Sequence, residues 1–295
     1  MTNEIFWKYP DAIVSCEWLN KNINNPDIRI YDCTTYLHYR DEDPSLPYIV
    51  ESGREKYDLS HIPNSSFWDL QLQLSDQESP YRFTLPKLDV LAESFRKLGV
   101  GDPFHIILYS RNGSQWSARL WWMLRAVGFD NVSILDGGFN EWEKLGFITS
   151  NINLSFTASH LTFQPRPNIF VNKDLVMNAI NDNNTKILNS LTSDIHSGKN
   201  PRYGRRGRIP NSLNIPFNEL VDSENGKFIN IKELSKLFSD KKIDKHHQIL
   251  NYCGGGIAAS LEAFVLYQLG FENIMIYDNS LSEWAIDDNL PIETD

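Results

Sequence analysis

The residues with the clearest chemical potential lie in the segment Tyr252–Ser260, which reads YCGGGIAAS. A cysteine thiolate is a strong nucleophile, and three glycines directly follow Cys253. Glycine accepts positive φ angles, which we expect at Gly255 in particular, so the loop can turn several N–H groups toward one centre. A buried strand is predicted before the loop and a helix after it, and the helix N-terminus adds partial positive charge. The pattern predicts a readily ionised nucleophile at Cys253. The anionic substrate would be bound by the backbone of Gly254, Gly255, Gly256, Ile257 and Ala258.

The other two cysteines, Cys16 and Cys33, lack such a loop, and we interpret them as structural. Three scattered cysteines are too few for a disulfide framework or a zinc cluster, so we expect no metal ion. Unpaired cysteines and a first segment without a secretory pattern predict a cytoplasmic protein.

The elements that must position Cys253 occur twice, because the chain contains an internal repeat. Residues 108–142 align with residues 251–284, and HIPNS at 61–65 aligns with RIPNS at 208–212. The matched positions include Gly128 with Gly270, Asp136 with Asp278, and Glu141-Trp142 with Glu283-Trp284. Such an ordered series of matches indicates a duplicated domain.

Each copy alternates short apolar runs with helical patterns. The runs predict strands at 105–109, 132–135, 186–188, 248–252 and 273–277. Helices are expected over 117–127 and through 261–269, the second one amphipathic, and Gly128 and Gly270 would end them. Alternation of this kind predicts α/β domains, each a small parallel sheet with helices on both faces. We place the N-terminal domain at 1–150, a linker at 151–167 and the C-terminal domain at 168–295.

Several segments of both copies resemble one known family. They are Tyr31-Asp32-Cys33, His61–Ser65, Trp121–Arg125, Leu135–Phe139, Gly207–Pro216 and Tyr252–Ser260. Together they resemble the tandem rhodanese-like sulfurtransferases that use thiosulfate or 3-mercaptopyruvate. The resemblance implies two rhodanese-like domains, of which the first is catalytically inactive and the second catalytic. It also implies a Cys253 persulfide that passes sulfur from a small anionic donor to cyanide or a thiol, with ping-pong kinetics and no cofactor.

One part of the family pattern is absent. The family's Asp-Ala-Arg run, which binds the anionic donor, appears here as Asn189-Ser190-Leu191. The arginine-rich segment PRYGRRGR at 201–208 offers replacements, because guanidinium groups bind anions in a bidentate manner. We take Arg202 and Arg206 as candidate donor-binding residues. The alternative interpretation of this segment is a solvated loop.

Ser110 aligns with Cys253 in the first copy. Its loop holds one glycine and no histidine that could activate the hydroxyl, so we expect no second catalytic site there. We expect the cleft near the domain interface, where the first copy would contribute side chains such as Arg111 or Trp116.

Composition excludes other classes of function. The chain has 28 Lys and Arg against 38 Asp and Glu, a net charge of −10, which disfavours general binding to nucleic acid or anionic membranes. No apolar run is long enough for a transmembrane helix. A cysteine phosphatase would need an arginine six residues after the nucleophile, where this chain has Ala259. A non-catalytic or weakly catalytic sulfur carrier or sensor remains the alternative, and we expect a monomer.

Overall fold

The computed structural model describes residues 5–40 and 47–295. The elements of the first half are η1 (Pro10–Ala12), β1 (Ile13–Val14), α1 (Cys16–Asn22), β2 (Ile28–Asp32), β3 (Thr35–Tyr39), β4 (Tyr48–Ser52), α2 (Arg54–Leu59), β5 (Ser65–Phe67), α3 (Leu70–Gln73), α4 (Leu88–Lys97), β6 (His105–Tyr109), α5 (Gln115–Ala126), β7 (Val132–Leu135) and α6 (Gly138–Lys144). Those of the second half are β8 (Phe170–Val171), α7 (Lys173–Ala179), β9 (Thr185–Asn189), α8 (Ser193–His196), β10 (Leu213–Asn214), η2 (Phe217–Glu219), α9 (Ile231–Ser239), β11 (Gln248–Tyr252), α10 (Ile257–Gln268), β12 (Ile274–Tyr277) and α11 (Ser280–Trp284). None of the helices in these described parts is long and apolar enough to cross a bilayer.

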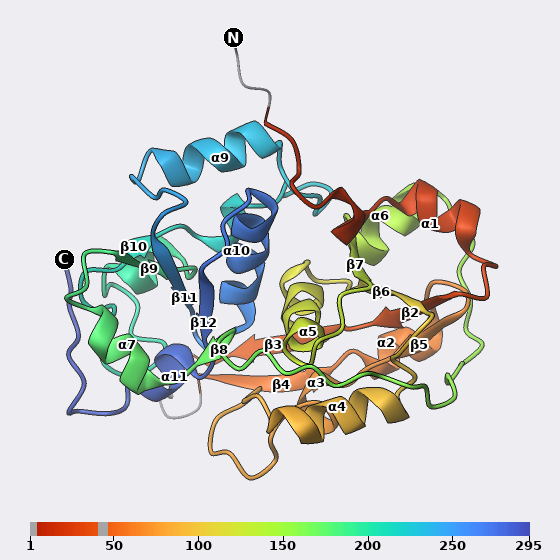
Figure 1. The fold of residues 1–295 in the computed structure, drawn as a ribbon, viewed down its shortest axis with the longest axis horizontal. Helices are drawn as coiled ribbons and strands as arrows, with labels where there is room; N and C mark the ends of the chain where they lie inside the picture. Colours follow the sequence, from red (N-terminus) through yellow and green to blue (C-terminus); the bar gives the residue numbers. More distant parts are fainter. Residues whose placement is uncertain (1–4, 41–46) are drawn as a thin grey trace.

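Each half forms one five-stranded sheet, and the repeat extends to strand order. The first sheet runs β1-β7-β6-β2-β5, and the second runs β8-β12-β11-β9-β10 in the same sense. Every pair of neighbouring strands in both sheets is parallel. The predicted fold class is therefore confirmed, with the two α/β domains lying side by side in Figure 1.

The matching HIPNS and RIPNS motifs have the same structural role in both copies. Tyr252, at the end of β11, is fully buried, and its hydroxyl accepts the N–H of Ile209 at 3.1 Å. The same hydroxyl lies 2.9 Å from the Ser212 hydroxyl. Tyr109 makes the equivalent two contacts with the first motif, at 3.3 and 3.1 Å. A buried phenol needs hydrogen-bond partners, so each tyrosine ties its central strand to the neighbouring loop.

Helices α5 and α10 pack against each other between the two sheets (Figure 1). Trp122 donates its indole N–H to the Ser260 carbonyl at 3.1 Å, and Trp121 meets Phe264 edge-on at 4.9 Å. Every residue of α10 except Tyr267 is buried. The predicted amphipathic character of this helix is therefore wrong: one face covers its own sheet and the opposite face is covered by α5.

The first domain also carries an antiparallel hairpin of β3 and β4 that the sequence patterns did not predict. In Figure 1 the hairpin extends from the first domain toward the second. Tyr39 and Tyr48 are paired across its outer end. The hairpin thereby brings two aromatic side chains of the first copy to the domain interface.

Candidate active site

Cys253 lies at the carboxyl end of β11, the central strand of the second sheet. Its thiol is free, and the residue is 2% exposed. It borders a cavity of about 220 Å³ between the domains, where the sequence predicted a cleft. The first domain contributes Leu37, Tyr39, Tyr48, Phe83, Asn112, Gln115 and Trp116 to the lining, and the second contributes Leu191, Tyr203, Phe217, Cys253, Gly254, Gly255, Ile257 and Ala258.

The start of α11 holds the cysteine loop from behind. Ser280 accepts the N–H of Cys253 at 3.0 Å through its side-chain oxygen. The N–H groups of Leu281 and Ser282 donate to the carbonyls of Cys253 and Gly254 at 3.1 and 2.9 Å. Within the described chain, the N–H groups from Gly254 to Ala258 have no backbone or side-chain acceptor outside their helix. The loop therefore has free donors next to the thiol, as an anion nest requires.

The three loop glycines differ in what makes glycine necessary. Gly256 has φ of 76°, and a Cβ there would lie 2.6 Å from the Asp278 carbonyl oxygen. A Cβ at Gly254 would overlap the Tyr203 phenol. Gly255 has no positive φ, and the nearest atom to its Cβ position is the Tyr48 hydroxyl at 3.2 Å. The expectation of positive φ at Gly255 is therefore wrong, because the chain makes its left-handed turn one residue later, where α10 begins.

The two candidate arginines lie in different surroundings. The guanidinium carbon of Arg202 lies 4.0 Å from the centre of the Tyr39 ring, and that ring lines the cavity. Arg206 donates instead to the carbonyls of Gly198 and Lys199, at 3.4 and 3.3 Å. Donor binding stays a prediction for both residues, and the geometry favours Arg202.

The remaining arginines of the same segment hold the C-terminal part of the chain. Arg205 donates to four carbonyls between Trp284 and Leu290. Arg208 forms ion pairs with Glu293 at 2.5 Å and Asp295 at 2.6 Å. Arg205 and Arg208 therefore have a structural role, which accounts for part of the arginine-rich segment.

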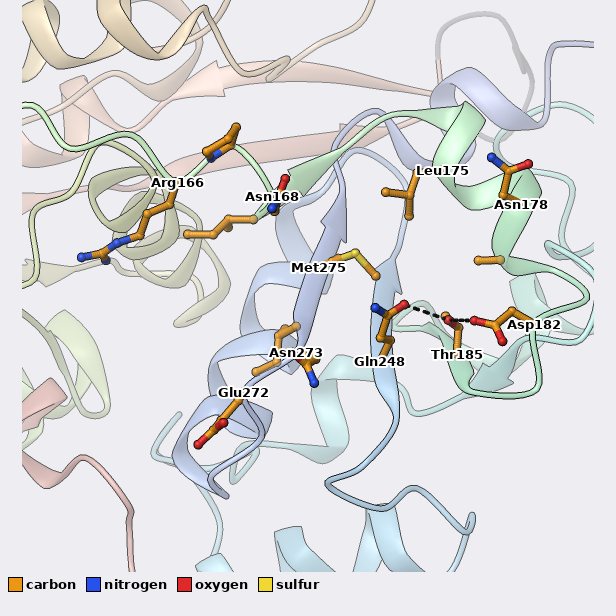
Figure 2. A pocket seen from close by; sticks show the side chains of 14 residues that line it. Arg166, Asn168, Leu175, Asn178, Asp182, Thr185, Gln248, Glu272, Asn273 and Met275 are labelled. Atoms are coloured by element: carbon orange, nitrogen blue, oxygen red, sulfur yellow. Dashed lines mark hydrogen bonds between the residues drawn. The ribbon is translucent and has the colours of Figure 1, made fainter.

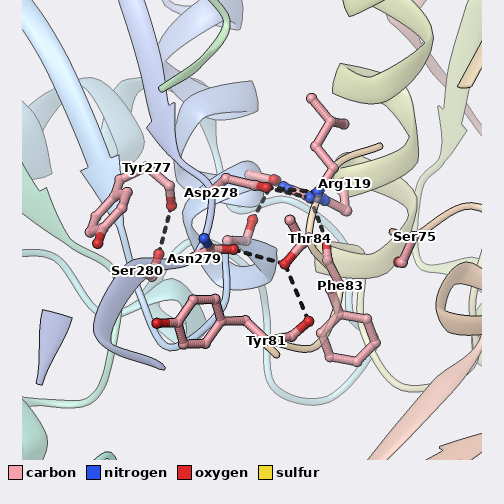
Figure 3. Close-up of polar contacts among 12 residues, drawn as sticks. Ser75, Tyr81, Phe83, Thr84, Arg119, Tyr277, Asp278, Asn279 and Ser280 are labelled. Carbon is pink, nitrogen blue, oxygen red and sulfur yellow. Dashed lines mark hydrogen bonds and ion pairs between the residues drawn. The ribbon is translucent and has the colours of Figure 1, made fainter. Parts of the chain in front are cut away.

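A residue that the sequence analysis did not single out, Arg119 of α5, supports the loop from the first domain. Its Nη2 donates to Asp278 Oδ1 at 2.5 Å and to the Phe83 carbonyl at 2.7 Å (Figure 3). Asp278 Oδ2 accepts the N–H of Leu85 at 2.7 Å. Nη1 of the fully buried Arg119 lies 2.9 Å from the Cβ position of Gly256. The ion pair therefore joins the domains directly behind the glycine loop.

The repeat contained a signal for this contact, because Asp278 aligns with Asp136. Asp136 accepts the N–H of Phe228, from the second domain, at 2.9 Å. Burial raises the pKa of Asp136 to about 6. In each domain, the carboxylate at this repeated position therefore accepts a backbone N–H from the other domain.

The first-copy loop contributes unevenly to the cavity. Trp116 lines it, as expected. Arg111 is turned into the first domain, where it pairs with Asp32 at 3.5 Å and lies 3.6 Å from the centre of the Phe139 ring. Ser110 donates its hydroxyl to the Gly113 carbonyl at 2.5 Å.

Two other features resemble binding sites. Asp244, His246 and His247 place three possible metal ligand atoms within 4.8 Å of one another, but they precede the amino end of β11 and two of them are exposed. A larger cavity of about 760 Å³ also lies where β9, β11 and β12 begin (Figure 2). Hydrogen bonds from Thr185 to Asp182 and Gln248 cross its wall. No cysteine lines it, and in such sheets ligands bind at the opposite, carboxyl end.

Fold and site together define a two-domain α/β protein with one cysteine in a glycine loop at the end of a central parallel strand. A family model described as the rhodanese-like domain matches residues 15–145 and 171–287. The chain belongs to the rhodanese-like domain family.

Relatives match the chain over most of its length. Thiosulfate/3-mercaptopyruvate sulfurtransferase 1, mitochondrial, from Arabidopsis thaliana is 30% identical over 96% of this chain and 78% of that protein. The 3-mercaptopyruvate sulfurtransferase of Escherichia coli K12 is 29% identical over 95% of this chain and 97% of that protein. The crystal structure of SseA from Escherichia coli superposes with a TM-score of 0.76 and 28% identity, covering 91% of this chain and 98% of SseA. The chain is a sulfurtransferase.

Proposed function

We propose that Cys253 accepts a sulfane sulfur from thiosulfate or 3-mercaptopyruvate and passes it to a thiophilic acceptor, cyanide or a thiol. The observation that carries this is the thiol's position at a cavity, beside loop N–H groups without other acceptors. The thiolate forms a bond to the outer sulfur of thiosulfate or to the single sulfur of 3-mercaptopyruvate. The S–S or C–S bond of the donor breaks, and its electron pair leaves with sulfite or the pyruvate enolate. The acceptor then attacks the outer sulfur of the persulfide and restores the thiolate, which gives ping-pong kinetics.

We propose that the backbone N–H groups of the loop are the main binding groups for the transferred sulfur. The N–H groups of Gly254, Gly255, Gly256, Ile257 and Ala258 would hold the terminal sulfur anion of the persulfide. Arg202 would attract the donor at the Tyr39 wall, and Arg206 is the second proposed cation. The Arabidopsis relative is a thiosulfate/3-mercaptopyruvate sulfurtransferase and the Escherichia coli relative a 3-mercaptopyruvate sulfurtransferase, which supports these two donors.

We further propose that the protein acts as a monomer in the cytoplasm, with domain boundaries in residues 151–167. All three cysteines are free thiols, which suits a reducing compartment. Size-exclusion chromatography with light scattering tests the monomer.

The persulfide is tested by intact mass after incubation with thiosulfate and, separately, with 3-mercaptopyruvate. The wild type should gain one sulfur atom, Cys253→Ser should gain none, and Cys33→Ser should behave as the wild type. A sulfur gain by folded Cys253→Ser would overturn the proposal. Steady-state turnover with cyanide separates an enzyme from a sulfur carrier, since a carrier would form the persulfide without turnover.

A further inference from the structure

The cavity beside Cys253 is walled by aromatic rings. The ring of Tyr48 is stacked on that of Phe83 with 6.2 Å between centroids, and Phe83 meets Trp116 edge-on at 5.5 Å. Tyr39 continues this wall, edge-on to Tyr48 at 6.3 Å. Tyr203 adds a ring from the second domain. Binding of a flat apolar group against these rings would be favourable, because it removes apolar surface from water.

Apart from the Cys253 nucleophile itself, none of the described residues that line this cavity carries a formal charge. The nearby cations are engaged elsewhere: Arg119 with Asp278, and Arg206 with carbonyls of its own loop. Arg202 lies over the Tyr39 ring, and the exposed Arg82 precedes Phe83 in the chain. Positive charge therefore lies beside the cavity, while the walls around the thiol are neutral.

The polar atoms of the walls are neutral hydrogen-bonding groups. The Tyr48 hydroxyl lies over Gly255, and the Tyr203 hydroxyl over Gly254. Burial raises the pKa of both phenols above the usual value, so both remain protonated. They can each donate one hydrogen bond to an oxygen of a bound anion, but they cannot neutralise its charge.

Charge and shape together decide which donor fits. A dianion loses more hydration than a monoanion on entering a neutral cavity, and it is repelled more strongly by the Cys253 thiolate. An aromatic group of the donor would offset this cost by burying apolar surface against the aromatic rings of the cavity. Thiosulfate has no apolar surface to bury. We propose that this site prefers organic sulfane-sulfur donors with an aromatic or apolar body and a single negative charge over thiosulfate. The proposal rests on the Cys253 persulfide.

Aryl thiosulfonates have the chemistry that this site would take. The Cys253 thiolate bonds to the outer sulfur of benzenethiosulfonate, the donor's S–S bond breaks, and its electron pair leaves with benzenesulfinate. The charge that leaves is carried by sulfinate oxygens, which can accept hydrogen bonds from Tyr48 and Tyr203. No oxidant or reductant is needed.

The test compares three donors in single turnover, with persulfide formation followed by intact mass. Benzenethiosulfonate, methanethiosulfonate and thiosulfate are used, and each second-order rate constant is divided by that of the same donor with free cysteine. The normalised rates should fall in that order, with benzenethiosulfonate ahead of thiosulfate by about tenfold or more. A normalised rate for thiosulfate equal to or above that for benzenethiosulfonate overturns the preference.

A matched pair of variants tests the role of charge. Gln115 lines the cavity, is half-buried and stands at the first position of α5. Gln115→Lys adds a cation, and Gln115→Met keeps the length without charge. Gln115→Lys should raise the thiosulfate rate relative to benzenethiosulfonate several-fold, and Gln115→Met should not. Equal ratios in both variants, with wild-type Tm, contradict the role of charge.

The two proposals fail in different ways. Absence of any persulfide on the wild type with all three donors would overturn the function of Cys253 itself. A persulfide that forms fastest from thiosulfate would leave that function intact and overturn only the donor preference.

Discussion

Asp278 and Arg119 belong to different domains, and their Oδ1 and Nη2 atoms are 2.5 Å apart behind the cysteine loop. The Arg119 side chain is fully buried and that of Asp278 is 13% exposed. Water therefore cannot replace either partner when the other is lost. The pair makes the position of Gly256, and with it the loop around Cys253, depend on domain packing.

The first prediction is that Asp278→Asn destabilises the protein by about 3 kcal/mol, because it leaves a buried guanidinium without its counter-charge. Urea unfolding measures this change. The control is Asp130→Asn, which removes the surface ion pairs of Asp130 with Arg125 and Arg166, in which Asp130 is 50% exposed. That control should cost less than about 1 kcal/mol. Equal effects of the two variants would show that the Arg119 contact contributes no more than a surface pair.

The second prediction separates the loop glycines. Gly256→Ala should lose about 1–2 kcal/mol of stability, because its φ of 76° is unfavourable for a residue with a Cβ. It should also lose most of the rate of persulfide formation. Gly255→Ala should retain both properties, since the nearest atom to its Cβ would be the Tyr48 hydroxyl at 3.2 Å, at the end of a side chain that can shift slightly. Tm and single-turnover rates are the measurements, and a larger loss in Gly255→Ala would contradict the assignment.

The third prediction concerns Glu262, a fully buried residue of α10. Burial raises its pKa to about 8, although Ser190 donates a hydrogen bond to it at 2.5 Å. The folded state thus holds a proton that the unfolded state releases above pH 4.5, so stability falls as pH rises from about 4.5 to 8. By pH 7 this contribution costs roughly 3 kcal/mol.

Glu262→Gln, which has no proton to lose, should therefore become increasingly more stable than the wild type as pH rises from 5 to 8. Chemical unfolding at several pH values tests this. Glu233→Gln, on the exposed side of α9, is the control for the same replacement without burial. A constant difference between Glu262→Gln and the wild type across this pH range would mean that Glu262 is already ionised in the folded protein.

The fourth prediction distinguishes two residues of the first-copy loop. Ser110→Ala should retain full sulfur transfer, because its hydroxyl only closes the loop onto the Gly113 carbonyl. Trp116→Leu removes a ring from the cavity wall and should raise KM for the donor several-fold with little change in kcat. Steady-state measurements of kcat and KM for both variants test these expectations. A several-fold rise in KM for Ser110→Ala would assign that serine a part in donor binding.

The duplicated α/β fold and the position of Cys253 could be predicted from the sequence alone. These features depend on local patterns: apolar runs for strands, and Gly128 and Gly270, which adopt the positive φ expected at helix ends. The glycine loop was recognisable because three consecutive glycines after a buried strand are rarely needed for packing alone. The motifs at 61–65 and 208–212 were visible as a match before their tyrosine partners were known.

The side chains that share the cavity with Cys253 became apparent only in the tertiary structure. Tyr39, Tyr48 and Trp116 reach it from a hairpin and a helix of the other domain, more than 130 residues away in the chain. The same packing buried α10 on both faces and paired Arg119 with Asp278. Arg111 and Arg206 are held away from the cavity by contacts within their own domains. Contacts between domains depend on how two finished surfaces fit together. Periodicity and spacing describe each surface separately, so they cannot specify that fit.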